Sequence, residues 1–210
     1  MSPALTVAVP RGALFAEALD LLDRLEIDTA DVRGNDRKLW FADAGIVTVR
    51  PSDVPTYVEH GAAELGITGK DVLAEQADAD VYELLDLGFG YCRMVVAARE
   101  NEDSLGESLR RLGRVRIATK YPRTATAWFA RTGRQAEVVE VKGSVELAPL
   151  CGLADGIVDL TASGRTLVEN GLEIVEEIAP STARLVANPV AHKLKADAID
   201  ELVARIRGLA

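Results

Sequence analysis

The chain has 210 residues, of which 48% are hydrophobic and 27% are charged, and its formal net charge is −9. This length suits one large domain or two domains of about a hundred residues each. No stretch approaches the roughly 18 apolar residues of a membrane span. The negative net charge argues against nonspecific nucleic-acid binding, which requires a basic face.

Short apolar strands alternate with amphipathic helices along the chain, and this pattern predicts an α/β fold with mostly parallel sheets. In the first part we expect strands at 6–9, 45–49, 65–68 and 81–85, a helix at 13–25 and a second helix capped by Ser52. Residues 86–90 then form a flexible break. After the break we expect strands at 116–119, 137–141 and 156–160, a helix after Ser144 and a last helix at 196–207.

The break suggests that the chain forms two lobes. We expect a first lobe of residues 1–88 and 174–210, with a second lobe, residues 89–173, inserted in it. The chain would then cross between the lobes twice. This is the layout of a hinged binding protein, in which ligands occupy the cleft at the carboxyl ends of the strands.

The start of the chain and its cysteines indicate the compartment. The first residues lack the basic segment and the long apolar core of a signal peptide. Cys92 and Cys151 lack metal-ligand spacing, and so few cysteines in a chain of this length are typical of a reducing environment. We therefore expect a cytoplasmic protein.

The segment 156–166 carries the strongest site signal. A short apolar strand reaches Asp159, the small-residue loop 161–164 follows, and Arg165 opens a helix. Such a loop can receive a phosphate through its backbone N–H groups, and the acid can accept hydrogen bonds from ribose hydroxyls. The chain lacks a G-x-x-x-x-G-K-[ST] motif, and residues 88–93 lack the third glycine of a dinucleotide fingerprint. An ordinary strand-to-helix turn with a serine cap is the alternative.

These residues resemble the phosphoribosyl pyrophosphate loop of phosphoribosyltransferases. The surrounding sequence is similar to the signature of the ATP phosphoribosyltransferase family, which catalyses the first step of histidine biosynthesis. The similar segments are 9–12, 50–55, 58–61, 65–73, 92–94, 118–122, 142–149, 152–155, 164–167 and 169–172. The resemblance covers nearly the whole chain and implies a two-lobed, periplasmic-binding-protein-like (type II) fold. Ala13 departs from the family, which usually has a second basic residue there.

The resemblance implies the reaction and its residues. A phosphoribosyl group passes from phosphoribosyl pyrophosphate to N1 of ATP, pyrophosphate leaves, and the substrates carry Mg²⁺. The implied catalytic residues are Asp159 and Glu146. The residues implied for phosphoribosyl pyrophosphate are Lys142, Asp159, Thr161, Ala162, Ser163, Gly164, Arg165 and Thr166. The residues implied for ATP are Arg11, Gly12, Arg50, Gly69, Asp71 and Arg93.

Some of these residues also have ordinary interpretations. Glu146 either stabilises a helix dipole from its first turn or contacts the substrate hydroxyls or their Mg²⁺. Arg11 and Arg50 each directly follow a strand, and this position favours a ligand contact over a surface role.

The end of the chain indicates the partners. Long members of the family carry a further C-terminal domain that binds histidine, and no room for one follows the last helix. The chain therefore resembles the short form, for which we expect a homodimer that assembles with a regulatory subunit resembling histidyl-tRNA synthetase. A cytoplasmic, hinged small-molecule-binding module of the same fold, without catalysis, is the competing hypothesis.

Overall fold

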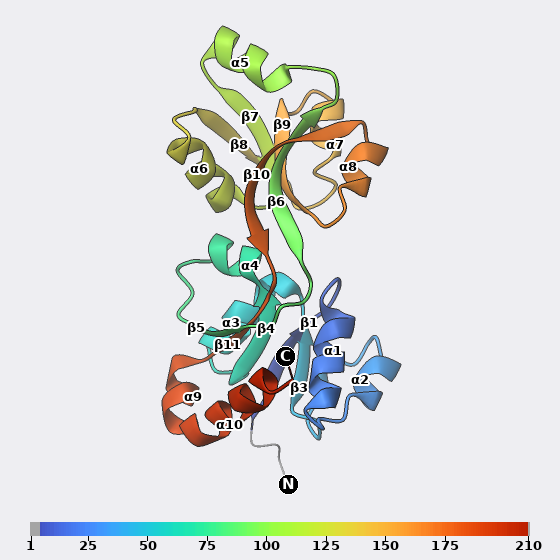
Figure 1. Ribbon diagram of the computed structural model, residues 1–210, viewed down its shortest axis with the longest axis vertical. Helices are drawn as coiled ribbons and strands as arrows, with labels where there is room; N and C mark the ends of the chain where they lie inside the picture. The colour runs from blue at the N-terminus through green and yellow to red at the C-terminus, as the bar shows by residue number, and fades with distance from the viewer. Residues whose placement is uncertain (1–4, 210) are drawn as a thin grey trace. The chain divides into compact units, whose positions relative to one another are not determined.

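The computed structural model describes residues 5–209, and these divide into two compact units. Unit 1 contains the described residues up to Gly90 and those from Thr182 onward, and unit 2 is the continuous segment Tyr91–Ser181. Figure 1 shows the chain passing from unit 1 into unit 2 and back. Within residues 5–209, no helix is long and apolar enough to cross a membrane.

Unit 1 is built on a six-stranded sheet with the order β2-β3-β1-β4-β11-β5. Its strands are β1 (Val7–Pro10), β2 (Trp40–Phe41), β3 (Ile46–Val49), β4 (Leu65–Gly69), β5 (Tyr82–Asp86) and β11 (Ala183–Ala187). Its helices are α1 (Phe15–Arg24), α2 (Ala30–Gly34), the 3-10 helix η1 (Pro51–Asp53), α3 (Val54–Glu59), α4 (Lys70–Glu75), α9 (Pro189–Leu194) and α10 (Ala196–Arg207).

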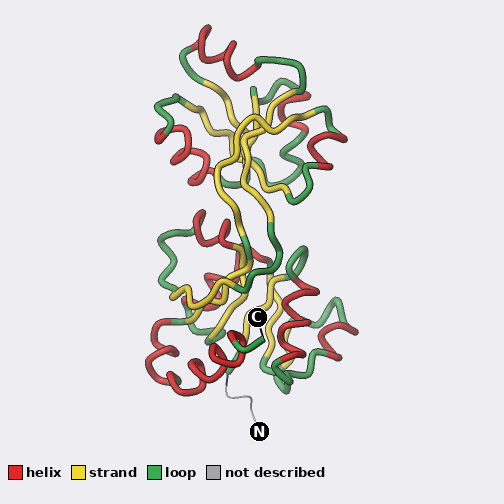
Figure 2. The backbone as a smooth tube through the Cα atoms, in the orientation of Figure 1, coloured by secondary structure: helices red, strands yellow, loops and turns green. Residues whose placement is uncertain are grey.

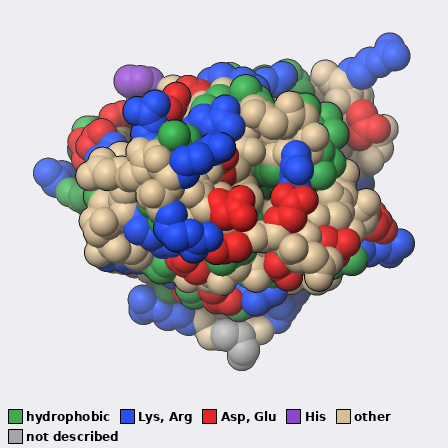
Figure 3. Space-filling view, turned by 90° about the horizontal axis from the view of Figure 1, so that it is seen from above, with side chains coloured by type: hydrophobic (Ala, Val, Ile, Leu, Met, Phe, Trp, Pro, Cys, Tyr) green, Lys and Arg blue, Asp and Glu red, His purple; other side chains and the backbone are tan. Residues whose placement is uncertain are grey.

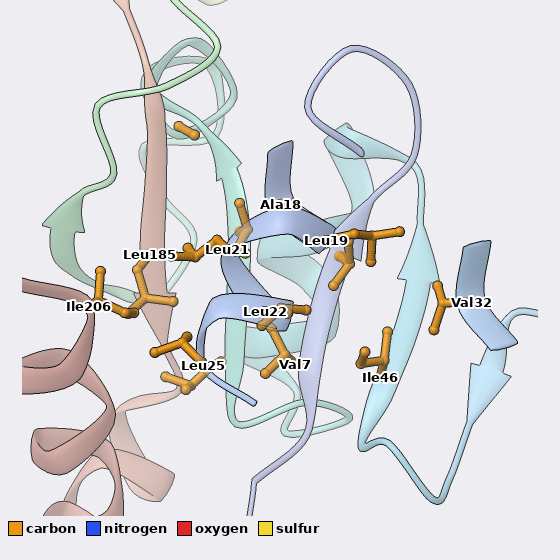
Figure 4. Close-up of a cluster of buried hydrophobic side chains, with 14 of the residues drawn as sticks. Val7, Ala18, Leu19, Leu21, Leu22, Leu25, Val32, Ile46, Leu185 and Ile206 are labelled. Carbon is orange, nitrogen blue, oxygen red and sulfur yellow. The ribbon is translucent and has the colours of Figure 1, made fainter. Parts of the chain in front are cut away.

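Helices cover both faces of this sheet. Strand β1 is buried along its whole length because its alternate side chains enter two hydrophobic clusters. Val7 and Val9 belong to the cluster that includes residues of α1 and α10, whereas Ala8 belongs to the cluster of α3. Leu22 of α1 lies over Val7 in the first cluster (Figure 4). Full burial of a side chain such as leucine contributes about 1.5–3 kcal/mol.

Unit 2 is built on a five-stranded sheet with the order β10-β6-β9-β7-β8. Its strands are β6 (Cys92–Arg99), β7 (Val115–Thr119), β8 (Ala136–Glu140), β9 (Gly156–Thr161) and β10 (Leu172–Ser181). Its helices are α5 (Ser104–Leu112), α6 (Pro122–Arg131), α7 (Leu147–Leu150) and α8 (Arg165–Glu169). Helices α5 and α6 share one hydrophobic cluster with Val158 of β9, and α7 and α8 share the other with Ile157.

The prediction of mostly parallel sheets is wrong. Strand β1 pairs parallel with β3 and β4, and β7 pairs parallel with β8 and β9. Strands β2, β6, β10 and β11 pair antiparallel with their neighbours. The chain re-enters unit 1 at Thr182. The next residue, Ala183, accepts from the Leu87 N–H and donates to the Phe89 carbonyl oxygen, just beyond the end of β5. Strand β11 therefore runs back along β5.

The second crossing lies after Ser181, later than the expected boundary at 173, because residues 172–181 form β10 of the unit 2 sheet. Strands β10 and β6 run side by side in Figure 2. The cap predicted at Ser52 is also wrong. Ser52 lies within η1, and its hydroxyl donates to Asp53 Oδ1 at 3.1 Å.

Candidate functional site

The small-residue loop joins β9 to α8 in unit 2. Gly164 has φ +79° and precedes the first residue of the helix, a left-handed conformation that glycine adopts without steric cost. Thr161 Oγ1 accepts from the Gly164 N–H at 2.8 Å, and Ser163 Oγ accepts from the Arg165 N–H at 3.3 Å. These two bonds hold the turn in one conformation.

The rest of the loop is open to a ligand. Ala162, Ser163 and Thr166 are exposed. Within residues 5–209 their N–H groups have no hydrogen-bond partner in the protein. Exposed N–H groups at the start of a helix attract anions. The Arg165 guanidinium instead pairs with Glu169 at 2.7 Å.

Asp159 lies in the same strand, just before the loop. It is 7% exposed, and its Oδ1 accepts from the Leu160 N–H at 2.8 Å. Lys120 Nζ lies 3.2 Å from the same oxygen. Burial raises the pKa of Asp159, the Lys120 charge opposes this rise, and the like charge of Glu146 adds to it. Asp159 is therefore a buried acidic side chain directly before the small-residue loop.

The segment before α7 brings Glu146 into the electrostatic range of Asp159. Glu146 is half-buried and directly precedes α7, and Ser144 has φ +48°, which is uncommon for a residue with a side chain. Lys142 points elsewhere: its ammonium group pairs with Glu140, and its side chain is 89% exposed. The structure thus brings Glu146 to the site, while Lys142 lies at the same end of the sheet without reaching Asp159.

Arg93 also belongs to unit 2. It pairs with Thr161 in the register of β6 and β9, so it lies beside the start of the loop. Its guanidinium donates to Glu177 Oε2 at 3.0 Å. Of the residues expected to contact ATP, Arg93 therefore belongs to unit 2, where it lies beside the loop between β9 and α8.

The other residues expected to contact ATP gather at one edge of the unit 1 sheet. Strands β3, β1 and β4 are adjacent and parallel, so their carboxyl ends lie together. Arg11, Arg50 and Gly69 are at these ends. Asp71 follows in the first turn of α4, and a Cβ added to Gly69 would lie 2.1 Å from its Oδ1. Only glycine therefore fits at position 69 without displacing the carboxylate.

The two arginines at this edge differ in their surroundings. Arg11 donates to the carbonyl oxygens of Asn35 and Lys38, and its guanidinium lies 5.2 Å from the centre of the Phe15 ring. Arg50 is exposed, and its side chain forms no hydrogen bond or ion pair within the described part of the chain. Arg50 can therefore bind an anion without first breaking an existing contact.

Lys120 also lies beside Asp159, although it is not among the residues expected to bind either substrate. Only the register between β7 and β9 reveals its proximity to Asp159. In residues 5–209, no group of three or more His, Cys, Asp or Glu side chains is arranged to hold a metal ion. Acidic and basic side chains are interspersed on the face seen in Figure 3, so the net negative charge does not form one continuous acidic region there.

Comparison with known proteins gives a consistent family. The profile of the ATP phosphoribosyltransferase family (HisG) matches residues 50–208. An ATP phosphoribosyltransferase of Rubrobacter xylanophilus is 51% identical over 205 residues, covering 96% of this chain and 94% of that protein.

Two solved structures show similar folds. A chain of the ATP phosphoribosyl transferase (HisG:HisZ) complex from Thermotoga maritima has a TM-score of 0.81 and 33% identity, with coverage of 97% of this chain and 96% of that chain. The periplasmic aliphatic sulphonate binding protein SsuA from Escherichia coli has a TM-score of 0.61 and 13% identity, with coverage of 96% and 70%. The second likeness is one of fold alone.

Proposed function

The chain belongs to the ATP phosphoribosyltransferase family, and on this basis we propose roles for the residues of the site. The enzyme transfers a phosphoribosyl group from phosphoribosyl pyrophosphate to N1 of ATP and releases pyrophosphate, the first step of histidine biosynthesis. The relatives thus favour an enzyme over a binding module without catalysis. The near full-length identity to relatives of this name is the observation that carries the conclusion.

In our proposal, unit 2 binds phosphoribosyl pyrophosphate. The exposed N–H groups of Ala162, Ser163 and Thr166 receive the 5-phosphate, and the Thr166 hydroxyl adds a further donor. Asp159 accepts hydrogen bonds from the ribose hydroxyls, because an ionised carboxylate is an acceptor only. Glu146 contacts the same sugar from the start of α7, while Lys142 and Arg165 contribute positive charge around the phosphates.

The reaction requires electrostatic stabilisation more than a nucleophile. The ribosyl carbon becomes cationic as the pyrophosphate leaves, so fixed negative charge near the sugar lowers the barrier. We assign this role to Asp159 and Glu146, the two carboxylates whose charges interact in unit 2. Mg²⁺ carried by the substrates would supply positive charge that offsets the charge of the pyrophosphate.

We place ATP at the edge of unit 1 where β1, β3 and β4 end. Arg50 is the favoured phosphate contact because it is exposed and its side chain is not engaged within residues 5–209. Gly12, Gly69 and Asp71 line the same edge, and Arg11 contributes from the end of β1. Arg93, which lies in unit 2 beside the start of the loop after β9, offers a further guanidinium for a phosphate group.

The partner proposal rests on the solved neighbour, whose title names a complex of HisG with HisZ. We propose that this chain is a short-form catalytic subunit, which forms a homodimer and assembles with a regulatory subunit resembling histidyl-tRNA synthetase. We also propose a cytoplasmic location. The low cysteine content of the sequence supports this proposal.

The decisive assay follows pyrophosphate release from Mg²⁺-ATP and phosphoribosyl pyrophosphate, with and without the regulatory subunit. Asp159→Asn and Thr166→Ala should each lower kcat/KM for phosphoribosyl pyrophosphate about ten- to a hundredfold, the effect of losing a charge-assisted hydrogen bond. Folded variants with wild-type kinetics would overturn the site assignment. Binding of both substrates without pyrophosphate release, in the presence of the partner, would contradict the activity.

A further inference from the structure

The carboxyl ends of β7 and β9 bring a lysine and the buried aspartate together. The two strands are parallel neighbours, and Thr119 is the register partner of Val158. The next residues along the strands are Lys120 and Asp159, and Lys120 Nζ lies 3.2 Å from Asp159 Oδ1. The contact therefore follows from strand register and does not depend on a flexible loop.

The backbone around Lys120 is held by the side chain of a buried threonine, Thr119. Thr119 is fully buried, and its hydroxyl donates to the Val158 carbonyl oxygen at 2.6 Å. The same Oγ1 accepts from the Tyr121 N–H at 2.8 Å. These bonds join β7 to β9 and hold the backbone on both sides of Lys120. The lysine side chain is 43% exposed, and its ammonium group lies 5.4 Å from the centre of the Tyr121 ring.

Among residues 5–209, Lys120 provides a positive charge against Asp159. The Leu160 N–H and the like charge of Glu146 also act on this carboxylate. Burial and Glu146 raise the pKa of Asp159, whereas Lys120 and the N–H lower it. Without Lys120, burial and the like charge would favour the protonated acid. A protonated acid carries a donor hydrogen and has less capacity to accept hydrogen bonds from two neighbouring hydroxyls.

We propose that Lys120 is a positioning residue for phosphoribosyl transfer, which keeps Asp159 ionised and oriented toward the ribose hydroxyls. The inference rests on the proposed function, because it requires the sugar to bind at Asp159. Lys120 acts through Asp159 and does not have to touch the substrate. Arginine can replace its charge, whereas methionine keeps most of the aliphatic chain and removes the charge.

The test compares Lys120→Met and Lys120→Arg with a matched control. Arg110→Met removes another ion pair of unit 2, between Arg110 and Asp103 at 2.9 Å on α5. The measured quantities are kcat, the KM for each substrate and the Kd of phosphoribosyl pyrophosphate as functions of pH, in the presence of the regulatory subunit. Melting temperatures verify folding.

We expect Lys120→Met to raise the Kd and KM for phosphoribosyl pyrophosphate at least tenfold at neutral pH, with little change in the KM for ATP. The pH below which binding weakens should move upward in this variant. Lys120→Arg should restore most of the affinity, and Arg110→Met should behave like the wild type. Asp159→Asn has no carboxylate to ionise, so adding Lys120→Met to it should cause little further loss.

Two results would overturn the inference while leaving the proposed function intact. In the first, Asp159→Asn is impaired but Lys120→Met keeps the wild-type pH profile. In the second, the losses of the two substitutions multiply in the double variant. A wild-type enzyme that does not bind phosphoribosyl pyrophosphate, or an Asp159→Asn variant that binds it normally, would instead contradict the proposed function itself.

Discussion

Arg11 donates its Nε–H to Thr48 Oγ1 at 3.1 Å, so the side chain that follows β1 is hydrogen-bonded to a residue of the neighbouring strand β3. The other end of the same guanidinium donates to the carbonyl oxygens of Asn35 and Lys38. Arg11 therefore connects the sheet edge to the segment between α2 and β2. Its structural contacts set it apart from Arg50, although both residues follow strands at the proposed ATP edge.

This difference predicts separate effects for two substitutions. Arg50→Ala should raise the KM for ATP about tenfold, the cost of one charge-assisted hydrogen bond, without changing the melting temperature. Arg11→Ala should lower stability by about 1–2 kcal/mol because it leaves carbonyl oxygens without their donor. Calorimetric titration with ATP and thermal unfolding of both variants separate the two effects. Unchanged ATP affinity in both variants would contradict the ATP assignment, and equal melting temperatures would contradict the structural role of Arg11.

Asp159→Asn should separate stability from activity. Because the folded-state pKa of Asp159 is raised above its ordinary value of 3.8, its contribution to stability is fully present below that value. This contribution is lost as the pH rises through the raised pKa. The neutral amide should therefore leave the free energy of unfolding at neutral pH unchanged or higher, while kcat/KM falls. Denaturant titrations at acidic and neutral pH measure this. A large loss of stability at neutral pH would show that the Lys120 pair outweighs burial.

The loop geometry predicts a strong effect for Gly164→Ala. An added Cβ meets only Ile174 Cδ1 at 3.8 Å, an ordinary contact, so the cost comes from the left-handed φ of +79°. This cost is about 1–2 kcal/mol. Gly133→Ala is a matched control, because Gly133 has φ +71° and open space but lies after α6. Both variants should lose similar stability, and only Gly164→Ala should lose affinity for phosphoribosyl pyrophosphate. Equal affinities would exclude the loop as the phosphate site.

We expect the free energy of unfolding of unit 2 to depend on pH because of the carboxylate of Glu176 in β10. Arg134 donates to both of its oxygens, and Trp128 Nε1 donates at 3.1 Å. The Arg134 hydrogen bonds are the main reason that the pKa of Glu176 is lowered from 4.5, although burial opposes this. The stabilisation is therefore present above pH 4.5 and decreases as the pH falls through the lowered pKa.

Glu176→Gln should cost about 1–3 kcal/mol at neutral pH, because the amide removes the negative charge opposite Arg134 and keeps only one acceptor oxygen. It should also reduce the acid dependence of unfolding. Chemical denaturation of both proteins between neutral and acidic pH measures the difference. Trp128→Phe, which removes only one donor, should have a smaller effect. A variant with the wild-type acid dependence would show that this cluster does not contribute.

The partner proposal predicts how histidine acts. The purified chain alone should be weakly active or inactive and insensitive to histidine. Addition of the regulatory subunit should restore both activity and feedback inhibition, because an effector shifts an equilibrium only when it binds the two states unequally. Steady-state assays with a histidine titration decide this. Full activity with strong inhibition in the absence of a partner is the contrary result.

Local sequence predicted the elements whose pattern is complete in a few residues. The last helix occupies residues 196–207 as expected, because Ile199 and Ile206 repeat on one buried face. Strands β1, β3 and β4 are short apolar runs buried along their length, and this is a clear signal. The turn between β9 and α8 was predicted from small residues that follow an apolar strand, although Thr161 is the last residue of β9 and not part of the loop.

The long strand β10, at one edge of the unit 2 sheet, was not predicted, because its pairing is nonlocal. Strand β10 contains Glu173, Glu176 and Glu177, and its register with β6 shifts in two places, so no regular alternation marks it. The contact between Lys120 and Asp159 was missed for the same reason. It depends on which residue of β7 lies opposite β9, and that information is absent from either segment alone.

The position of β11 has a consequence for synthesis on the ribosome. This strand lies between β4 and β5 in the finished sheet, but the whole of unit 2 is translated before it. Unit 2 is one continuous segment and can fold as it emerges. Until β11 is translated, the edges of β4 and β5 that pair with it have unsatisfied backbone hydrogen-bonding groups. Such edges can pair incorrectly with other strands. The sheet of unit 1 is therefore completed only when residues 183–187 have left the ribosome, and α9 and α10 follow it.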